Sequence, residues 1–339
     1  MRVASRAPMR IEFGGGGTDI PSFSDKYGGV VLNATINKYI YTTLQPSHGT
    51  DLKVITTETD KSILFKDAKD LVYNGDSDLI KAIIRRMKVN YGSEIYMRSE
   101  APPESGLGSG SAISVAMVGL FNHLRHNQKF NNYQIAENAY EIMRDELNVQ
   151  GGKQSFYSAA FGGFNTIEFM ENGFVRVNPL KLKNNTLADL EKHLLLVYVG
   201  QKDKGVTSQN IIKKQESKYG EQQGVALLEK LKGLALDMQD SIQNSDLERF
   251  GMLMNTAFET KKVLQPQITN KRIEAISNLV LKNGALSSRI QGAGGGGHML
   301  VLCNPNKEHN VMKALLEKGI HTVPYSFTNK GLEIWEASD

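Results

Sequence analysis

The stretch that decides the fold of this protein is a glycine- and serine-rich loop, Pro102-Pro103-Glu104-Ser105-Gly106-Leu107-Gly108-Ser109-Gly110-Ser111-Ala112. Strand-like residues 94–97 precede it, and the apolar, unbroken residues 112–124 follow it as a predicted buried helix. Glycines let a ligand approach the backbone closely, and the start of a helix offers free N–H groups and the positive end of the helix dipole. The loop therefore predicts a phosphate site. The alternative is a serine-capped turn between a strand and a helix.

Two further glycine runs lie far from this loop in the chain, at residues 14–17 and 292–297. Each lies beside a strand-like segment, and each costs chain entropy without adding side-chain packing. One such loop is compatible with a simple turn. Three of them indicate backbone that lines a common pocket for a polyanionic ligand.

The remaining pattern is typical of an α+β protein with two lobes. Residues 1 to about 60 alternate in short strand-like runs, and residues 133–147 have the apolar periodicity of an amphipathic helix. The polar stretch 181–192 predicts a boundary between lobes at residues 1–185 and 186–339. The other predicted elements are helix 77–91, strand 164–169 with a hairpin after it, strand 194–199, helices 220–243, 245–260 and 270–283, and strand 298–302.

Composition excludes several classes of protein. The 339 residues are 40% hydrophobic and carry a net charge of only +4 without a long basic run, so no nucleic-acid partner is expected. The single cysteine, Cys303, excludes an internal disulfide and a cysteine-based zinc site. No signal-like segment opens the sequence and no run of 18 apolar residues occurs, so we expect a cytoplasmic protein with a small-molecule substrate and no membrane partner.

The opening segment makes the sequence similar to a known family. It reads Arg6-Ala7-Pro8-Met9-Arg10-Ile11-Glu12-Phe13-Gly14-Gly15-Gly16-Gly17-Thr18-Asp19-Ile20-Pro21. Followed by the loop at 102–112 and the glycines at 292–297, it resembles the galactokinase, homoserine kinase, mevalonate kinase and phosphomevalonate kinase (GHMP) superfamily. Within that superfamily, residues 31–39, 151–154 and 157–165 also resemble the D-glycero-D-manno-heptose 7-phosphate kinases.

The resemblance implies a fold and a reaction. The implied fold has an N-terminal lobe like ribosomal protein S5 and a ferredoxin-like C-terminal lobe, with the active site between them. The implied reaction uses ATP and Mg²⁺ to phosphorylate the anomeric hydroxyl of a heptose 7-phosphate, which gives the 1,7-bisphosphate. A homodimer is a further expectation.

The resemblance also implies roles for single residues. Asp19 would hydrogen-bond two sugar hydroxyls, and Arg10 would stabilise the charge on the transferred phosphoryl group. The metal would bind Ser109 or Ser111. Other substrate contacts would come from Gly15, Gly16, Gly17, Thr18, Lys153, Gly294 and Gly295. The nucleotide would contact Pro103, Ser105, Gly106, Leu107, Gly108, Ser109, Gly110, Ser111 and Ala112.

Three of these residues are also compatible with a purely structural role. Asp19 is also compatible with an aspartate that closes a turn. Arg10 is compatible with an ordinary salt bridge, and Lys153 with a solvated loop lysine.

The sequence departs from the family pattern at the expected catalytic residues. Ser155, which we assign to the catalytic site, stands where such kinases have an aspartate base, and a serine is not a useful base at neutral pH. Met143 stands where they have a glutamate that binds magnesium. Glu141 is a poor replacement, because two residues along a helix correspond to a rotation of about 200°. The adjacent serines of the family loop are replaced by Ser109-Gly110-Ser111.

Three explanations of these departures remain open. The protein is a kinase that works without a strong base, since phosphoryl transfer depends mainly on positioning and charge. It acts on another acceptor, such as a phosphorylated polyol or a mevalonate phosphate. The third explanation is that the protein has the kinase fold but binds a nucleotide or a sugar with little catalytic activity.

Overall fold

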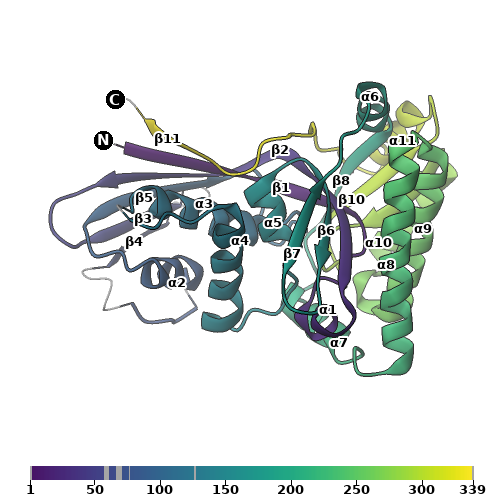
Figure 1. Cartoon of the computed structure of the whole chain (residues 1–339). Coiled ribbons are helices and arrows are strands. Elements are labelled where there is room, and N and C mark those ends of the chain that lie inside the picture. The colour runs from purple at the N-terminus through teal and green to yellow at the C-terminus, as the bar shows by residue number, and fades with distance from the viewer. Residues whose placement is uncertain (1, 57–60, 66–70, 76, 126, 338–339) are drawn as a thin grey trace.

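The computed structural model describes residues 2–56, 61–65, 71–75, 77–125 and 127–337, and its strands form two sheets (Figure 1). The first sheet is built on two long antiparallel strands, β1 (Arg2–Gly14) and β2 (Gly29–Pro46). It runs in the order β11-β1-β2-β5-β3-β4, and β6 and β7 continue it from the other end of β2. These further strands are β3 (Leu52–Thr56), β4 (Lys61–Phe65), β5 (Ser93–Ser99), β6 (Phe164–Phe169), β7 (Val175–Pro179) and β11 (Glu333–Ala337).

The second sheet is antiparallel and has the order β8-β10-β9. Its strands are β8 (Leu194–Gly200), β9 (Ala285–Ile290) and β10 (Gly297–Cys303). Every residue of β10, the central strand of this sheet, is buried. Cys303 ends this strand as a buried free thiol, as the sequence predicts.

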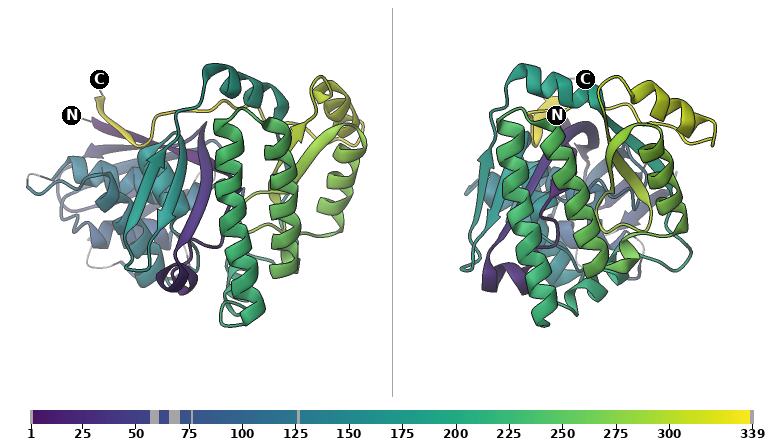
Figure 2. Two further views of the ribbon diagram at one scale, coloured as in Figure 1. Left: turned by 45° about the vertical axis from the view of Figure 1, so that its right-hand side comes forward. Right: turned by 90° about the vertical axis from the view of Figure 1, so that its right-hand side faces the viewer.

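Helices cover both sheets. Helices α3 and α5 pack on β1, whereas α8 packs on β1 and β2 and lies beside α9, which contacts β9 of the second sheet (Figure 2). The helices are α1 (Pro21–Tyr27), α2 (Asp78–Arg86), α3 (Ser109–His123), α4 (Asn132–Glu141), α5 (Gln154–Phe161), α6 (Asn184–His193), α7 (Ser208–Glu216), α8 (Gln222–Gln243), α9 (Leu247–Leu264), α10 (Lys271–Lys282) and α11 (Glu308–Leu316). A π-helical turn, η2 (Ile142–Glu146), and a 3-10 turn, η3 (Pro266–Ile268), complete them.

Most predicted elements are confirmed, but several differ from the prediction or were not predicted. Helix α3 begins at Ser109, three residues before the predicted start, so the serines of the loop form the first helical turn. The predicted helix 133–147 is α4 followed by the π-helical turn η2. The opening strands are long rather than short, and α1, which begins with Pro21 at a position that favours proline, was not predicted.

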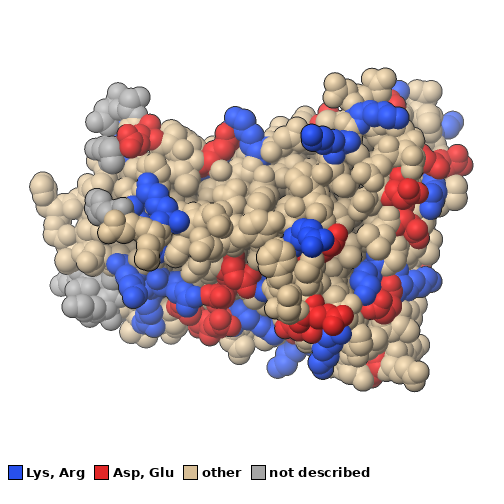
Figure 3. All heavy atoms as spheres, in the orientation of Figure 1, with Lys and Arg blue, Asp and Glu red and all other residues tan. Residues whose placement is uncertain are grey.

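The C-terminal strand returns to the first sheet. Strand β11 pairs antiparallel with β1, so the two ends of the chain lie side by side in Figure 1. The lobe boundary at residue 185 stays a prediction. On the face shown in Figure 3, basic and acidic side chains are interspersed. Among the described helices, none is both long and apolar enough to cross a membrane.

Candidate active site

A cavity of about 500 Å³ lies where the two halves of the chain meet. The first half contributes the end of β1, the loop before α3 and the start of α5, and the second half contributes α7, α9 and the loop after β9. The structure brings most of the predicted site residues together here. Those that line the cavity are Arg10, Gly17, Asp19, Pro103, Ser105, Gly106, Gly108, Ser109, Gly110, Ser111 and Ser155.

The phosphate loop ends in the open N-terminus of α3. Gly108 is the N-cap residue with φ of 80°, a left-handed conformation that favours glycine. The next three residues, 109–111, form the first helical turn, whose backbone N–H groups have no partner within the helix. They line the cavity, so an anion placed there meets these donors and the positive end of the helix dipole. The loop has the geometry of a phosphate site.

Arg10 is a buried cation at the edge of this loop. Its side chain is 7% exposed, and burial lowers the pKa of its guanidinium while the nearby carboxylates of Glu12 and Asp19 counteract that effect. Its Nε donates to Ser155 Oγ at 3.0 Å, and a terminal nitrogen donates to the carbonyl of Gly106 at 2.5 Å. These two contacts hold the guanidinium between the loop and α5. A cation held in this way stabilises developing charge without reorganising.

Asp19 lies on the same cavity, 2% exposed. One carboxylate oxygen accepts the backbone N–H of Gly17 and the other that of Gln154, both at 3.0 Å. Each oxygen therefore keeps acceptor capacity for a ligand hydroxyl. Burial raises the pKa of Asp19, although the two backbone N–H groups oppose the shift. An aspartate that only closes a turn would explain the Gly17 contact, but it would not explain why this buried carboxylate lies in the lining of the cavity.

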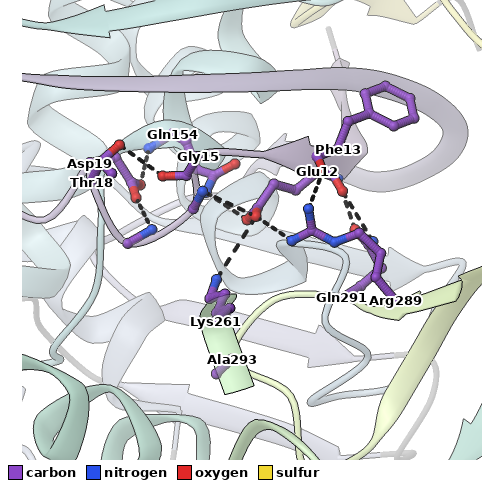
Figure 4. A network of polar contacts seen from close by, with 12 residues as sticks. Glu12, Phe13, Gly15, Thr18, Asp19, Gln154, Lys261, Arg289, Gln291 and Ala293 are labelled. Atoms are coloured by element: carbon purple, nitrogen blue, oxygen red, sulfur yellow. Dashed lines mark hydrogen bonds and ion pairs between the residues drawn. The ribbon is translucent and has the colours of Figure 1, made fainter. Parts of the chain in front are cut away.

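Behind Asp19 lies a buried ionic cluster that the sequence analysis missed (Figure 4). The carboxylate of Glu12 accepts from Arg289 at 2.6 Å and from the amide of Gln154 at 2.9 Å, and it lies 3.9 Å from the ammonium of Lys261. Gln291 completes the cluster by exchanging hydrogen bonds with the backbone of Glu12. The one available signal was the spacing of Arg10 and Glu12, because residues two apart on a strand share a face.

Opposing effects act on the ionisation of Glu12. Burial by itself would raise its pKa, but the cations Lys261, Arg289 and Arg10 outweigh burial and lower the pKa to about 2. The carboxylate is therefore ionised at neutral pH, and it joins β1 to α9 and β9 of the second half.

Three residues of the first predicted motif have structural contacts instead of lining the cavity. Thr18 is fully buried, and its hydroxyl donates to the carbonyls of Gly15 and Val30. Gly15 has φ of 84°, and a Cβ atom there would lie 1.9 Å from the Val30 carbonyl oxygen. Gly16 donates its N–H to Glu12. The glycine run is thus a tight turn that aims Asp19 at the cavity.

Other predicted contacts also lie away from the cavity lining. The side chains of Leu107 and Ala112 are fully buried in the core. Gly294 packs against Ile268, and Gly295 donates its N–H to the carbonyl of that residue. The cavity is lined instead by the preceding residues of this third loop, Gly292 and Ala293.

Lys153 is not a solvated loop lysine, which was the structural alternative to a substrate contact. It is 9% exposed, and its ammonium pairs with Glu137 at 2.6 Å and lies 4.9 Å from the centre of the Tyr140 ring. Lys153 therefore has a partner within the protein and does not line the cavity. Its role toward the substrate stays a prediction.

Met143 and Glu141 are placed as the sequence predicts. Met143 faces the phosphate loop, since its methyl carbon lies 3.7 Å from the position of a Cβ atom on Gly110. Glu141 points away from the cavity and pairs with Arg86. The π-helical distortion η2 begins after Glu141, so it does not turn this carboxylate toward the loop.

A second contact joins the phosphate loop to the other half of the chain. Glu104, at φ of 59°, pairs with Lys202 at 2.7 Å and accepts from the backbone and the hydroxyl of Ser208 at the start of α7. Both residues follow β8, far from the loop in sequence. This contact joins two residues of the cavity lining, Glu104 and Ser208, from the two halves of the chain, and no local pattern predicted it.

Comparison with known proteins places the chain in a family. Residues 77–163 match the GHMP kinases N terminal domain, and residues 238–321 match the GHMP kinases C terminal domain. The chain is 31% identical over 338 residues to the D-glycero-alpha-D-manno-heptose 7-phosphate kinase of Campylobacter jejuni, and the match covers 98% of each chain.

Two solved structures are similar over nearly their full length. A D-glycero-D-manno-heptose 1-phosphate kinase from Bacteroides thetaiotaomicron has a TM-score of 0.81 at 28% identity, over 99% of this chain and 100% of that one. A putative sugar kinase from Campylobacter jejuni has a TM-score of 0.79 at 30% identity, over 98% of each chain.

The protein is thus an ATP-dependent kinase that transfers a phosphoryl group to a hydroxyl. The chain belongs to the GHMP kinase family. The α+β fold with two lobes and the family resemblance seen in the sequence are both confirmed.

Proposed function

We propose that this kinase phosphorylates a sugar phosphate, and that its acceptor is a heptose 7-phosphate that reacts at the anomeric hydroxyl to give the 1,7-bisphosphate. The observation that carries the proposal is the cavity in which the phosphate loop, the fixed guanidinium of Arg10 and the carboxylate of Asp19 converge. The choice of heptose rests on the similarity to the Campylobacter jejuni kinase over 98% of both chains.

Each group in the cavity has a role in this reaction. The N-terminus of α3 binds the ATP phosphates, and Asp19 orients the acceptor by accepting hydrogen bonds from its hydroxyls. Arg10 stabilises the charge on the transferred phosphoryl group. Ser155 is not a useful base at neutral pH. The acceptor hydroxyl therefore loses its proton late in the reaction, which is compatible with the loose transition state of phosphoryl transfer.

Magnesium enters with ATP in this proposal. Within the described ranges, no three His, Cys, Asp or Glu side chains gather as a metal site. Two of the cavity carboxylates are engaged by cations, Glu12 by Arg289 and Glu104 by Lys202, and the third, Asp19, is assigned to the acceptor hydroxyls in this proposal. The hydroxyls of Ser109 and Ser111 fit an ion that keeps several waters and is held mainly by phosphate oxygens. When bound, the ion neutralises phosphate charge. The cytoplasmic location and a homodimer stay predictions.

An acceptor panel tests the function. With ATP and magnesium, heptose 7-phosphate should release ADP, and Asp19→Ala should lower kcat/KM by about 100-fold or more, because two charge-assisted hydrogen bonds are lost. The panel includes heptose 1-phosphate, hexoses, hexose phosphates and mevalonate phosphates, and ³¹P NMR of the product locates the new phosphate. Asp25→Ala, an exposed aspartate on α1, is the control and should leave the rate unchanged.

Two results would contradict the proposal. Turnover only with a mevalonate phosphate or another phosphorylated polyol would favour the second explanation of the sequence departures. Nucleotide binding without turnover on any acceptor would favour a binding protein, above all if Ser155→Asp then created activity.

The absence of a base is tested at Ser155. Replacing it with alanine should lower kcat by less than about tenfold, since the hydroxyl only receives the Arg10 Nε–H and takes no proton from the acceptor. The dependence of kcat on pH between pH 6 and 9 should have the same shape in the Ser155→Ala variant as in the native protein. A loss of about 10³-fold would mean that Ser155 takes part in proton transfer and would contradict the base-independent reaction.

A further inference from the structure

Lys261 is a buried ammonium that faces the cavity with most of its hydrogen-bonding capacity unused. It projects from α9 toward Glu12, beside Ala293 (Figure 4), and it is 5% exposed. Among the described residues, its charged partner is Glu12 at 3.9 Å, beyond hydrogen-bond distance. An ammonium has three N–H donors, and burying it without partners is costly.

Glu12 does not satisfy this ammonium, because the carboxylate oxygen nearest to it already accepts two hydrogen bonds. One oxygen accepts from Arg289 at 2.6 Å and from the Gly16 N–H at 3.2 Å, and the other accepts from Gln154 at 2.9 Å. Around this carboxylate the cluster holds three cations, Arg10, Lys261 and Arg289, against two carboxylates, Glu12 and Asp19. The cluster therefore carries one excess positive charge at the wall of the cavity.

Two residues that line the same cavity each carry a further buried polar atom without a partner among the described residues. The hydroxyl of Tyr140 and the side-chain oxygen of Gln154 make no hydrogen bond within the described part of the chain. Both residues are more than nine-tenths buried. Buried polar groups are rarely left without a partner, so the wall of this cavity is unusually rich in unsatisfied polar groups.

From this arrangement we propose that the ammonium of Lys261 binds a phosphate oxygen of the bound reactants, as a binding residue that no motif predicted. The inference rests on the proposed function, since it takes ATP and a sugar phosphate as reactants. The phosphate is either the group being transferred or the one already on the acceptor. Burial lowers the pKa of Lys261, and an anion at this place would oppose that shift.

The neighbouring lysine provides a matched control. Lys262 lies on the same helix, but its ammonium is half-buried outside the cavity and pairs with Glu259 at 2.6 Å and Glu274 at 3.4 Å. Replacing Lys261 with methionine removes the charge but keeps an unbranched side chain only one atom shorter, and it leaves the cluster neutral, so the fold should persist. Lys261→Gln is the second variant if the methionine protein does not fold, as thermal unfolding would report.

Binding is measured by titration calorimetry, which needs no turnover. The probes are a non-hydrolysable ATP analogue, heptose 7-phosphate and inorganic phosphate. Lys261→Met should weaken at least one of them by about 10- to 100-fold, the size of one charge-assisted hydrogen bond, and Lys262→Met should weaken none. Equal affinities in the two variants, or no phosphate binding by the native protein, would overturn the inference.

Kinetics then separate the two sources of phosphate. If Lys261 binds the phosphate on the acceptor, its loss raises KM for heptose 7-phosphate and leaves KM for an unphosphorylated heptose unchanged. If it binds the transferred group, kcat falls with both acceptors. A native protein that binds phosphate but turns over no sugar phosphate would refute the proposed function alone, while the calorimetry still decides on Lys261.

Discussion

Replacing Arg10 with methionine is expected to lower kcat by about 10³-fold or more, the effect of removing a fixed arginine from a phosphoryl-transfer site. The guanidinium is held by Ser155 and by the Gly106 carbonyl, so no solvent has to reorganise as charge develops on the phosphoryl group. Arg10→Lys retains the charge but cannot make the same two contacts, and it should lose about 10- to 100-fold. Steady-state rates with saturating ATP and acceptor measure both effects.

The control for this prediction lies on the same strand. Arg6 pairs with Glu333 at 2.6 Å and lies 4.6 Å from the centre of the Tyr39 ring, away from the cavity lining. Arg6→Met should therefore leave kcat close to the native value. Equal losses in the Arg6 and Arg10 variants would show that β1 had been disturbed, and an active Arg10→Met protein would refute the role given to Arg10.

Replacing Glu12 with glutamine is expected to reduce the free energy of unfolding by about 3–5 kcal/mol at pH 7, because the buried cations Arg289 and Lys261 lose their shared counter-charge. Urea unfolding of both proteins measures the difference. Glu168→Gln on β6 removes a half-exposed carboxylate that pairs with Arg176, and it should cost less than about 1 kcal/mol.

The pH dependence of this effect follows from the pKa of Glu12. In the folded protein the pKa is lowered from 4.5 to about 2, so the ionised carboxylate stabilises the fold at every pH above about 4.5. A pKa difference of one unit is worth about 1.4 kcal/mol, so the lowered pKa of Glu12 corresponds to about 3 kcal/mol. This contribution is lost as the pH falls toward 2, so the gap between native and Glu12→Gln proteins should narrow below pH 4.5. A gap that stayed constant down to pH 3 would contradict this account.

Features that depend on neighbouring residues could be predicted from the sequence. The helix after the phosphate loop, the amphipathic segment around Ile135 and the buried strand of Cys303 were all found, because periodicity and glycine placement act over a few residues. The direction of Glu141 also followed from helix geometry alone. The position of Asp19 at the cavity was expected only through the resemblance of its motif.

Features that depend on distant residues were missed. Arg289 is separated from Glu12 by 277 residues, yet the two form the ion pair at the centre of the buried cluster. Lys261 has the same appearance in the sequence as Lys262, and only the packing of α9 against the first half turns one toward the cavity and the other toward Glu259. Lys153 likewise finds Glu137 through the packing of α4 on α5.

The sequence by itself therefore determined the glycine-rich turn before α3, many of the helices and strands and the family, because these depend on backbone preferences and on short motifs. The tertiary structure alone decided which charges face the cavity and which neutralise one another. It also decided that Thr18 and Gly15 shape a turn and that β11 completes the first sheet. The physical reason is that burial and ion pairing depend on distances between residues that are remote in the chain, and those distances exist only after both halves have packed.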